Sequence, residues 1–196
     1  EGERRGKAWL EFRDAHAGRE IATAAEADRA EAIAGAVLGD PVARALLDQA
    51  PTREQRIDWV CAGRAFRSTP DAITRDGVVI DLKTTTDASV RGFQRRAWNL
   101  AYHAQLACYR AAVESTGRAV TGAALIAVES AYPYAVSVHT LSERVLAEGD
   151  RLWRAWFEQL RMCEIENHWP GYADRAVAFD VPEWLVEDNV EGEEDL

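Results

Sequence analysis

Two aspartates and a lysine stand close enough along the chain to form one chemical site. Asp71 precedes a short apolar stretch, and Asp81 and Lys83 follow the β-branched run Val78–Ile80. Side chains alternate along a strand, so Asp81 and Lys83 share one face while Leu82 points into the core. Converging carboxylates hold divalent cations through oxygen ligands. If Asp71 joins this face, the three residues predict a divalent-metal site with a charged neighbour.

The turn before the second strand decides on which face Asp71 lies. A two-residue loop would set Asp71 opposite Leu82, on the wrong face of the hairpin. A three-residue loop over residues 75–77, with Gly77 in the left-handed conformation, sets Asp71 directly opposite Asp81. Glycine stands at the position where this second geometry needs it, because it adopts positive φ without a steric penalty. We therefore expect the two carboxylates to face each other.

Composition indicates a globular protein with a substantial core. The chain has 196 residues, 47% of them hydrophobic, and seven tryptophans. We expect a single domain over residues 1–186, followed by an acidic tail at 187–196. No apolar run approaches the roughly 18 residues of a membrane span, so we expect no membrane contact. Three widely spaced cysteines do not suggest a disulfide framework and suit a reducing cytoplasm.

The net charge of −10 is unevenly distributed along the chain. Residues 183–196 carry seven acidic side chains and no basic one, whereas residues 53–110 carry ten Lys or Arg against six Asp or Glu. Attraction to phosphates depends on the local field rather than on the net charge. The basic segment that holds the candidate site is therefore compatible with DNA.

Apolar periodicity predicts an α/β fold with a mixed central sheet flanked by helices. We expect helices before a meander of strands that includes 53–61, and then one helix from Val90 to about Ser115. Apolar strands at 120–130 and 135–139 and a long helix at 142–167 should follow, with a short strand or turn at 177–181. On the helix over 90–115, Tyr102, Gln105 and Tyr109 fall on one stripe at spacings of three and four.

The motifs around the candidate site resemble one family of nucleases. Pro70-Asp71 followed by Asp81-x-Lys83 has the pattern of the PD-(D/E)xK superfamily. Gln105-x-x-x-Tyr109 lies downstream, Glu54 stands five residues before Trp59, and Trp169-Pro170-Gly171-Tyr172 comes near the end. Together these motifs are similar to the nuclease domain of exonuclease VIII, the RecE-type recombination exonucleases, from about residue 7 to about residue 186.

The resemblance implies a restriction-endonuclease-like core and a role for each matching residue. The implied metal ligands are Asp71, Asp81 and the main-chain carbonyl of Leu82, with Mg²⁺ or Mn²⁺ as the ion. The implied catalytic residues are Lys83, Glu54, Gln105 and Tyr109. For Glu54 the alternative is a solvated strand residue, and for Tyr109 it is core packing.

Further residues could contact the DNA backbone or complete the ligand set. Arg91, Arg95 and Arg96 begin the helix after Lys83 and could hold phosphates, although a solvated basic face is an equal interpretation. Similar nucleases also place a metal-binding histidine on an N-terminal helix. His16 lies in a different context, so either that histidine is upstream of the matching region or the site works without it.

The function that the resemblance implies is a metal-dependent exodeoxyribonuclease. It would degrade double-stranded DNA ends in the 5′→3′ direction and leave 3′ single strands for phage or prophage recombination. Relatives form rings around DNA, as homo-oligomers, and work with a single-strand annealing protein. An endonuclease or repair nuclease on the same fold is the first alternative, and a catalytically weak DNA-binding or assembly subunit is the second.

Overall fold

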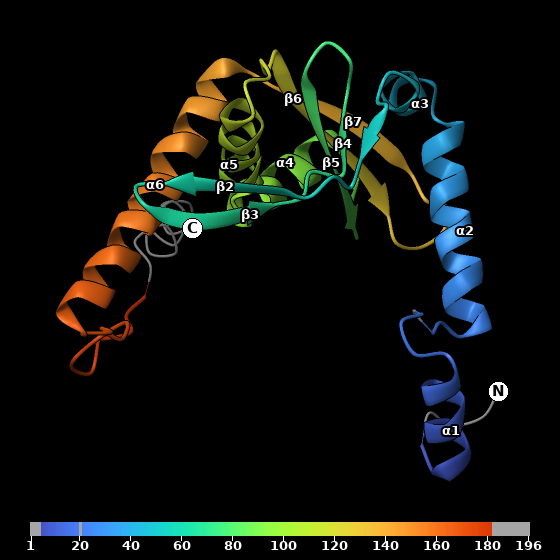
Figure 1. The fold of residues 1–196 in the computed structure, drawn as a ribbon, viewed down its shortest axis with the longest axis horizontal. Helices are drawn as coiled ribbons and strands as arrows, with labels where there is room; N and C mark the ends of the chain where they lie inside the picture. The colour runs from blue at the N-terminus through green and yellow to red at the C-terminus, as the bar shows by residue number, and fades with distance from the viewer. Residues whose placement is uncertain (1–4, 20, 182–196) are drawn as a thin grey trace, which may run out of the picture. The chain divides into compact units, whose positions relative to one another are not determined.

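A five-stranded mixed sheet in the order β1-β4-β5-β6-β7 carries the candidate site (Figure 1). The computed structural model describes residues 5–19 and 21–181. It divides into two units, residues 1–156 and 157–196, and the sheet belongs to the first. The elements are α1 (Lys7–Ala15), α2 (Ala24–Gly39), α3 (Pro41–Asp48), β1 (Thr52–Arg53), β2 (Ile57–Cys61), β3 (Arg64–Ser68), β4 (Ala72–Ile73), β5 (Val78–Thr85), α4 (Val90–Asn99), α5 (Tyr102–Ser115), β6 (Gly122–Glu129), β7 (Val136–Leu141) and α6 (Glu143–Glu166).

The register of the β4–β5 hairpin confirms the three-residue turn. Ala72 pairs with Ile80 and Ile73 with Val79, so the same register continued by one residue sets Asp71 opposite Asp81. Gly77 has φ 96°, in the left-handed region that favours glycine. Its carbonyl accepts a hydrogen bond from the Thr121 N–H at 3.1 Å, which ties the turn to the start of β6.

Gly77→Ala should destabilise the protein by more than its backbone strain alone. Left-handed backbone costs a non-glycine residue about 1–2 kcal/mol, and a Cβ at position 77 would also lie 2.5 Å from the Ala119 carbonyl oxygen. Gly63→Ala is the matched control, because Gly63 has φ 79° with open space around its Cβ position. Urea unfolding measures both variants. Equal losses of unfolding free energy would show that the contact with Ala119 has no effect.

The two faces of the sheet have different partners. Ile80, Ile126 and Val128 pack on one face against a core that includes Val37 of α2 and Leu47 of α3. Side chains alternate along each strand, so the neighbouring residues, including Asp81, point to the other face of the sheet. On that face α5 contacts β5. β5 and β6 run parallel, which requires a crossover, and α4 and α5 supply it (Figure 1). The crossover thereby brings its own side chains over Asp81.

Two expected elements are interrupted in the structure. The helix expected from Val90 to Ser115 is two helices, because Ala101 adopts φ 54° and ends the regular backbone between α4 and α5. The strand expected over 53–61 is broken at Glu54, which has φ 46°. The residues before this break join the main sheet as β1, and those after it form the separate β2–β3 hairpin.

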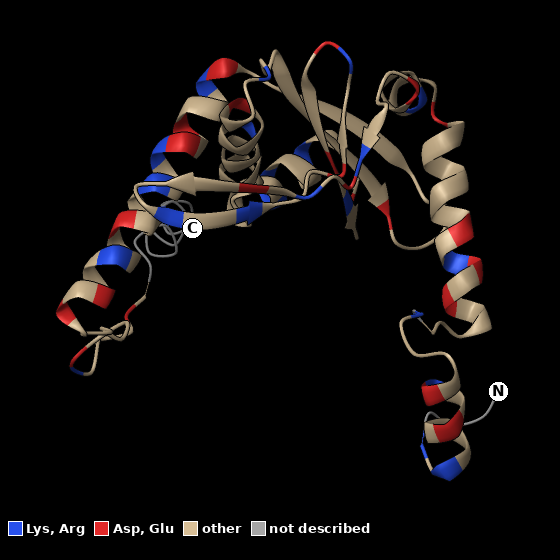
Figure 2. Cartoon of the chain, in the orientation of Figure 1, with Lys and Arg blue, Asp and Glu red and all other residues tan. Residues whose placement is uncertain are grey.

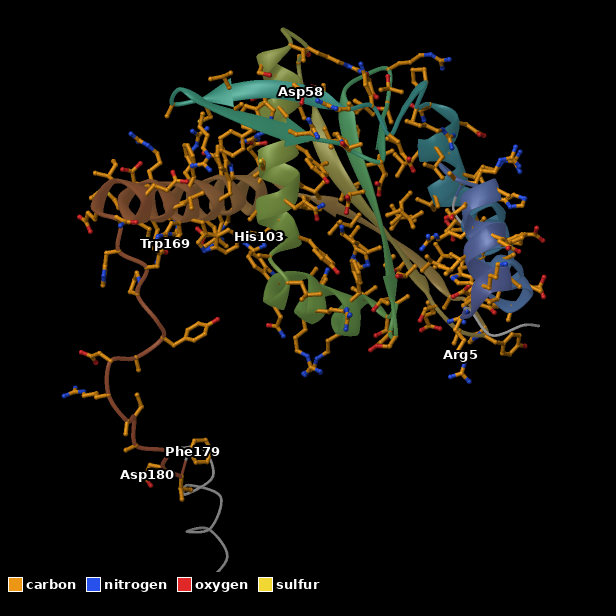
Figure 3. All side chains as sticks on the ribbon, turned by 60° about the horizontal axis from the view of Figure 1, so that its bottom comes forward. Arg5, Asp58, His103, Trp169, Phe179 and Asp180 are labelled. Carbon is orange, nitrogen blue, oxygen red and sulfur yellow. The ribbon has the colours of Figure 1, made fainter. Side chains whose placement is uncertain are left out.

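Helix α6 runs through both units, and basic and acidic residues alternate along it (Figure 2). Beyond it, residues 168–181 form no helix or strand, and residues 177–181 form no turn, so the short strand or turn expected there is a wrong prediction. Trp169 and Phe179 are exposed there (Figure 3). The tail expected at 187–196 lies outside the described residues. In the part of the chain that the structure describes, no helix combines the length and apolarity of a membrane span.

Candidate metal and catalytic site

The carboxylates of Asp71 and Asp81 are brought together by the hairpin. The Leu82 N–H donates to Asp71 Oδ2 at 2.6 Å, which fixes the Asp71 carboxylate against β5. Asp81 lies on the neighbouring strand with only 2% of its surface exposed. A charge-assisted hydrogen bond of this length holds its acceptor in one orientation. The main chain of β5 therefore positions one carboxylate beside the other.

Lys83 is held on the same face by three neighbours. Its Nζ lies 2.6 Å from Asp81 Oδ2 and donates to Gln105 Oε1 at 2.9 Å. The ammonium group also lies 4.6 Å from the ring centroid of Tyr102, a cation–π distance. Only 18% of the lysine side chain is exposed. Lys83 is thus a fixed positive charge rather than a mobile surface group.

Asp81 has the properties of a ligand for a hard cation. Burial raises the pKa of its carboxyl, and the Lys83 ammonium beside it opposes that rise. Asp81 Oδ2 is buried, and its polar neighbour among the described residues is the Lys83 ammonium, 2.6 Å away. Two neighbouring carboxylates with one ammonium keep an excess of negative charge, which fits a divalent cation because such ions take oxygen ligands.

Among the described residues, Asp71 and Asp81 are the side chains that could bind the metal at this site. Within residues 5–19 and 21–181, no group of three or more His, Cys, Asp or Glu side chains could hold a metal ion. His16 is the C-cap residue of α1, and its Nδ1 lies 2.8 Å from the Phe12 carbonyl oxygen. The main-chain carbonyl of Leu82 remains the predicted third ligand. Mg²⁺ commonly binds through one or two carboxylates and keeps several waters, so two carboxylates are sufficient for that ion.

Gln105 and Tyr109 both belong to the network around Lys83. Gln105 accepts from Lys83 through Oε1, and its Nε2 donates to the Tyr109 hydroxyl at 2.8 Å. The same Nε2 lies 3.5 Å from Asp81 Oδ1. Burial raises the pKa of the Tyr109 hydroxyl, which therefore stays protonated at neutral pH. The amide links the lysine to the tyrosine, and the role of each in catalysis stays a prediction.

Tyr102 contacts Lys83, and the sequence did not identify it as a residue of the site. It lies one turn before Gln105 on α5, and the helical stripe placed both residues on one face. The stripe alone does not distinguish an aromatic core residue from one that contacts a lysine. The Tyr102 ring also approaches Phe93 of α4, with centroids 6.3 Å apart. It therefore connects Lys83 to the next helix.

Glu54 lies beside Asp71 through its main chain. Its N–H donates to the Asp71 carbonyl oxygen at 3.0 Å, so the two residues occupy neighbouring positions across β1 and β4. The Glu54 residue is exposed, and among the described residues its carboxylate has no ion-pair partner. A role for this carboxylate near the metal stays a prediction.

Two of the three predicted phosphate-binding arginines, on α4, line a pocket together with the last residue of β5. Arg95 and Arg96 line a shallow pocket together with Thr85, two residues after Lys83. Arg91 does not line this pocket. The start of α4 already holds an anion, the Asp87 carboxylate that lines the same pocket, and hydrogen bonds from the Ser89 side chain and N–H lower the pKa of that carboxyl. The arginines, rather than the helix N-terminus, are the groups available to a phosphate there.

Comparisons with known proteins identify the family and the fold. The family described as PDDEXK-like domain of unknown function (DUF3799) matches residues 9–181. A candidate exonuclease from Eubacterium rectale is similar in structure, with a TM-score of 0.61 and 14% identity over 94% of this chain and 74% of that protein. At this identity the likeness shows the fold alone.

Other matches are more distant. An alkaline exonuclease from Laribacter hongkongensis has a TM-score of 0.39 and 18% identity, over 83% of this chain and 84% of that protein. The same nuclease matches equally in its complex with dAMP. A search of curated proteins found no match. The family match covers most of the sequence and includes both aspartates and the lysine, and the chain therefore belongs to the PDDEXK-like family DUF3799.

Proposed function

We propose that this chain is a metal-dependent deoxyribonuclease that hydrolyses phosphodiester bonds at the ends of double-stranded DNA. The observation that supports this most directly is the juxtaposition of two facing carboxylates with a lysine 2.6 Å from one of them. The PDDEXK-like family and the candidate exonuclease of similar fold add support. Degradation in the 5′→3′ direction, with 3′ single strands left for recombination, is part of the same proposal.

Each residue of the site has a distinct part in this reaction. Asp71 and Asp81 would hold Mg²⁺ or Mn²⁺ together with the Leu82 carbonyl. The ion supplies a water of lowered pKa and stabilises charge on the attacked phosphate. Lys83, fixed by Gln105 and Asp81, sets a positive charge where negative charge develops in the transition state. Gln105 orients the lysine, and Tyr109 holds the other end of the amide.

The arginines beside the site suit a substrate recognised by its backbone. Among the described residues Arg91, Arg95 and Arg96 are exposed on α4 and form no ion pair. By contrast, Arg56 and Arg67 pair with Asp58, labelled in Figure 3 on the β2–β3 hairpin. Phosphate contacts give affinity that is independent of sequence and falls with salt. In the cytoplasm, a ring of identical chains and a single-strand annealing partner would complete this proposed role.

Offering one plasmid as covalently closed circles and as linear duplex tests the proposal. We expect Mg²⁺-dependent degradation of the linear form, sparing of the circle, and no cleavage in chelator. Phosphorothioate blocks at either end then report the direction of digestion. Asp81→Asn, purified in parallel, controls for contaminating nucleases. Linearisation of closed circles would replace the exonuclease proposal with an endonuclease, and inactivity on both forms would contradict nuclease function.

A further inference from the structure

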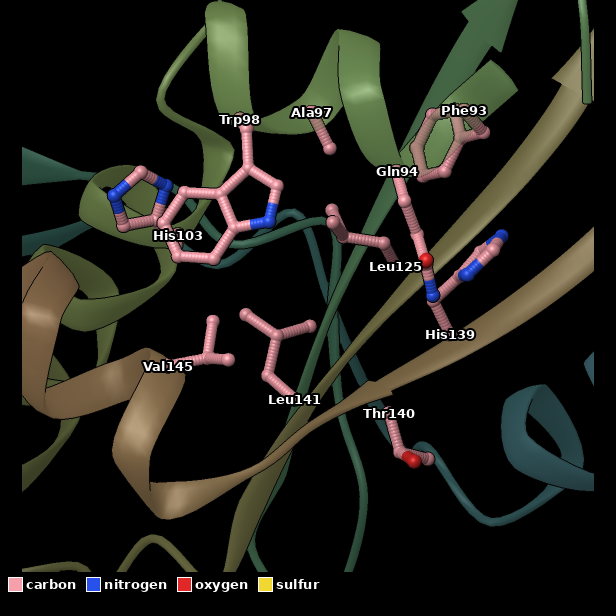
Figure 4. Close-up of a pocket in the computed structure, with 10 residues that line it drawn as sticks. All are labelled: Phe93, Gln94, Ala97, Trp98, His103, Leu125, His139, Thr140, Leu141 and Val145. Atoms are coloured by element: carbon pink, nitrogen blue, oxygen red, sulfur yellow. The ribbon is translucent and has the colours of Figure 1, made fainter. Parts of the chain in front are cut away.

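A second cavity lies on the same face of the sheet as Asp81, beneath the start of the crossover helices (Figure 4). Leu125 forms part of its lining and is the β6 partner of Asp81. His139 also lines it and is the β7 partner of Leu125. Strands are spaced about 4.8 Å apart, so His139 lies about 10 Å across the sheet from Asp81. That distance corresponds to about three base steps of duplex DNA.

Aromatic rings form the walls of this cavity. Trp98 packs against His103 with ring centroids 4.3 Å apart, and half of its surface remains exposed. The ring centroids of Phe93 and His139 lie 4.9 Å apart. The Phe93 ring also approaches Tyr102, whose own ring contacts the Lys83 ammonium. One layer of aromatic side chains thus separates the cavity from the catalytic lysine. An exposed indole face at its edge is a surface on which a flat ring can stack.

Several hydrogen-bonding groups at the cavity have no side-chain partner among the described residues. His103 is only 6% exposed, yet neither of its ring nitrogens has a hydrogen-bond partner among the described residues. The same holds for the Trp98 indole N–H and the Gln94 amide, which line the cavity with it (Figure 4). Gln94 and Trp98 are exposed residues, so their polar groups are open to water and to an occupant. An occupant with hydrogen-bonding edges can therefore pair with these groups while its flat face stacks on Trp98.

The tautomer of His139 follows from its neighbours. The Ser137 hydroxyl donates its one hydrogen to the Ala88 carbonyl oxygen at 2.7 Å. His139 Nε2, 2.8 Å from the same hydroxyl oxygen, must then be the donor, which leaves Nδ1 as an acceptor. Burial lowers the pKa of both His139 and His103, so both imidazoles are neutral near pH 7. The cavity therefore offers acceptors as well as donors.

We propose that this cavity binds an unpaired nucleobase of the DNA strand whose phosphate lies at Asp81, an inference that rests on the proposed nuclease function. No Lys, Arg, Asp or Glu lines the cavity, so it suits an uncharged heteroaromatic ring and not a phosphate. Stacking on Trp98 and hydrogen bonds to the base edge are how proteins hold bases taken out of the duplex. The base would lie within about three nucleotides of the scissile phosphate.

Fluorescence of 2-aminopurine, which falls when the base stacks, reads out occupancy without turnover. The analogue is placed in turn at each of the last three positions of a duplex end, and binding is measured in chelator. We expect quenching in the wild type at one of these positions. Trp98→Ala should lose it and weaken binding about 5- to 100-fold, whereas Trp98→Phe should retain most of it. Trp156→Ala is the matched control, because Trp156 is equally exposed and lies outside the cavity.

The outcomes separate this inference from the nuclease proposal. A mismatch at the end of the duplex should strengthen DNA binding by the wild type, because the mismatched base is already unpaired and binding need not supply that free energy. It should not strengthen binding by Trp98→Ala. If Trp98→Ala and Trp156→Ala quench and bind alike, the cavity inference is wrong, whether or not linear DNA is digested. If the base is quenched through Trp98 but no DNA is cleaved with any metal, the nuclease proposal fails and base binding stands. Failure of the wild type to bind DNA overturns both.

Discussion

Asp81→Asn should abolish DNA cleavage while the protein remains folded. The substitution removes one of the two facing carboxylates, and loss of about 4 kcal/mol of metal-derived stabilisation corresponds to roughly a thousandfold fall in rate. Asparagine keeps the shape and can still accept from Lys83. Because burial raises the pKa of the Asp81 carboxyl, its charged form is the costly one, and the neutral amide should not lower the free energy of unfolding at pH 7. Release of labelled nucleotides from linear duplex measures the rate.

Asp58→Asn is the matched control for this experiment. Asp58 is an exposed aspartate on β2 whose partners, Arg56 and Arg67, belong to the same hairpin region. The Asp58→Asn variant should cleave DNA and bind Mn²⁺ as the wild type does, whereas Asp81→Asn should lose Mn²⁺ binding in calorimetry. A folded Asp81→Asn protein that digests DNA at the wild-type rate would exclude Asp81 from the metal site. If Asp81→Asn loses cleavage but still binds Mn²⁺, the metal ligands are other residues.

Lys83→Met should lose turnover but keep the metal. Methionine retains a long unbranched side chain against Tyr102, while the charge 2.6 Å from Asp81 Oδ2 disappears. Removing one preorganised electrostatic contact typically lowers kcat about 10²- to 10³-fold. The ammonium competes with a cation for the same carboxylate oxygen, so its removal should leave Mn²⁺ affinity equal or higher. Calorimetry with Mn²⁺ and single-turnover cleavage measure the two effects separately.

The opposite pattern would contradict the assignment of Lys83. If Mn²⁺ binding falls as far as in Asp81→Asn, the lysine organises the metal site and its part in turnover is indirect. Lys83→Arg provides a further comparison, because it keeps the charge but replaces a compact ammonium with a planar fork. Partial recovery of turnover in this variant is expected if the position of the charge, rather than proton transfer, is what matters.

The facing carboxylates could be predicted because their geometry is local. One glycine with positive φ sets the length of the turn, and a period of two then fixes the face of every residue on both strands. The burial of Val79 and Ile80 followed from the same apolar run. These features depend on a dozen consecutive residues, for which spacing and side-chain type are sufficient.

The environment of Lys83 depends on distant residues and could be predicted only in part. The resemblance placed Gln105 beside the site, but the Tyr102 contact depends on how α5 crosses β5, which packing determines. The break at Ala101 has no sequence signal, because alanine rarely adopts the left-handed conformation seen there. The positive φ at Glu54 is equally unmarked, and it moved the start of the expected strand into another sheet.

The β4–β5 turn also decides where this protein can be labelled or tagged. Adding one residue between positions 75 and 77 would shift the pairing by one and carry Asp71 to the opposite face of the hairpin. The site would then be dismantled although each of its side chains is still present. The turn between β2 and β3 has no such constraint, since Gly63 there has open space around it. An epitope or fluorophore placed at Ala62–Gly63 leaves the catalytic register untouched.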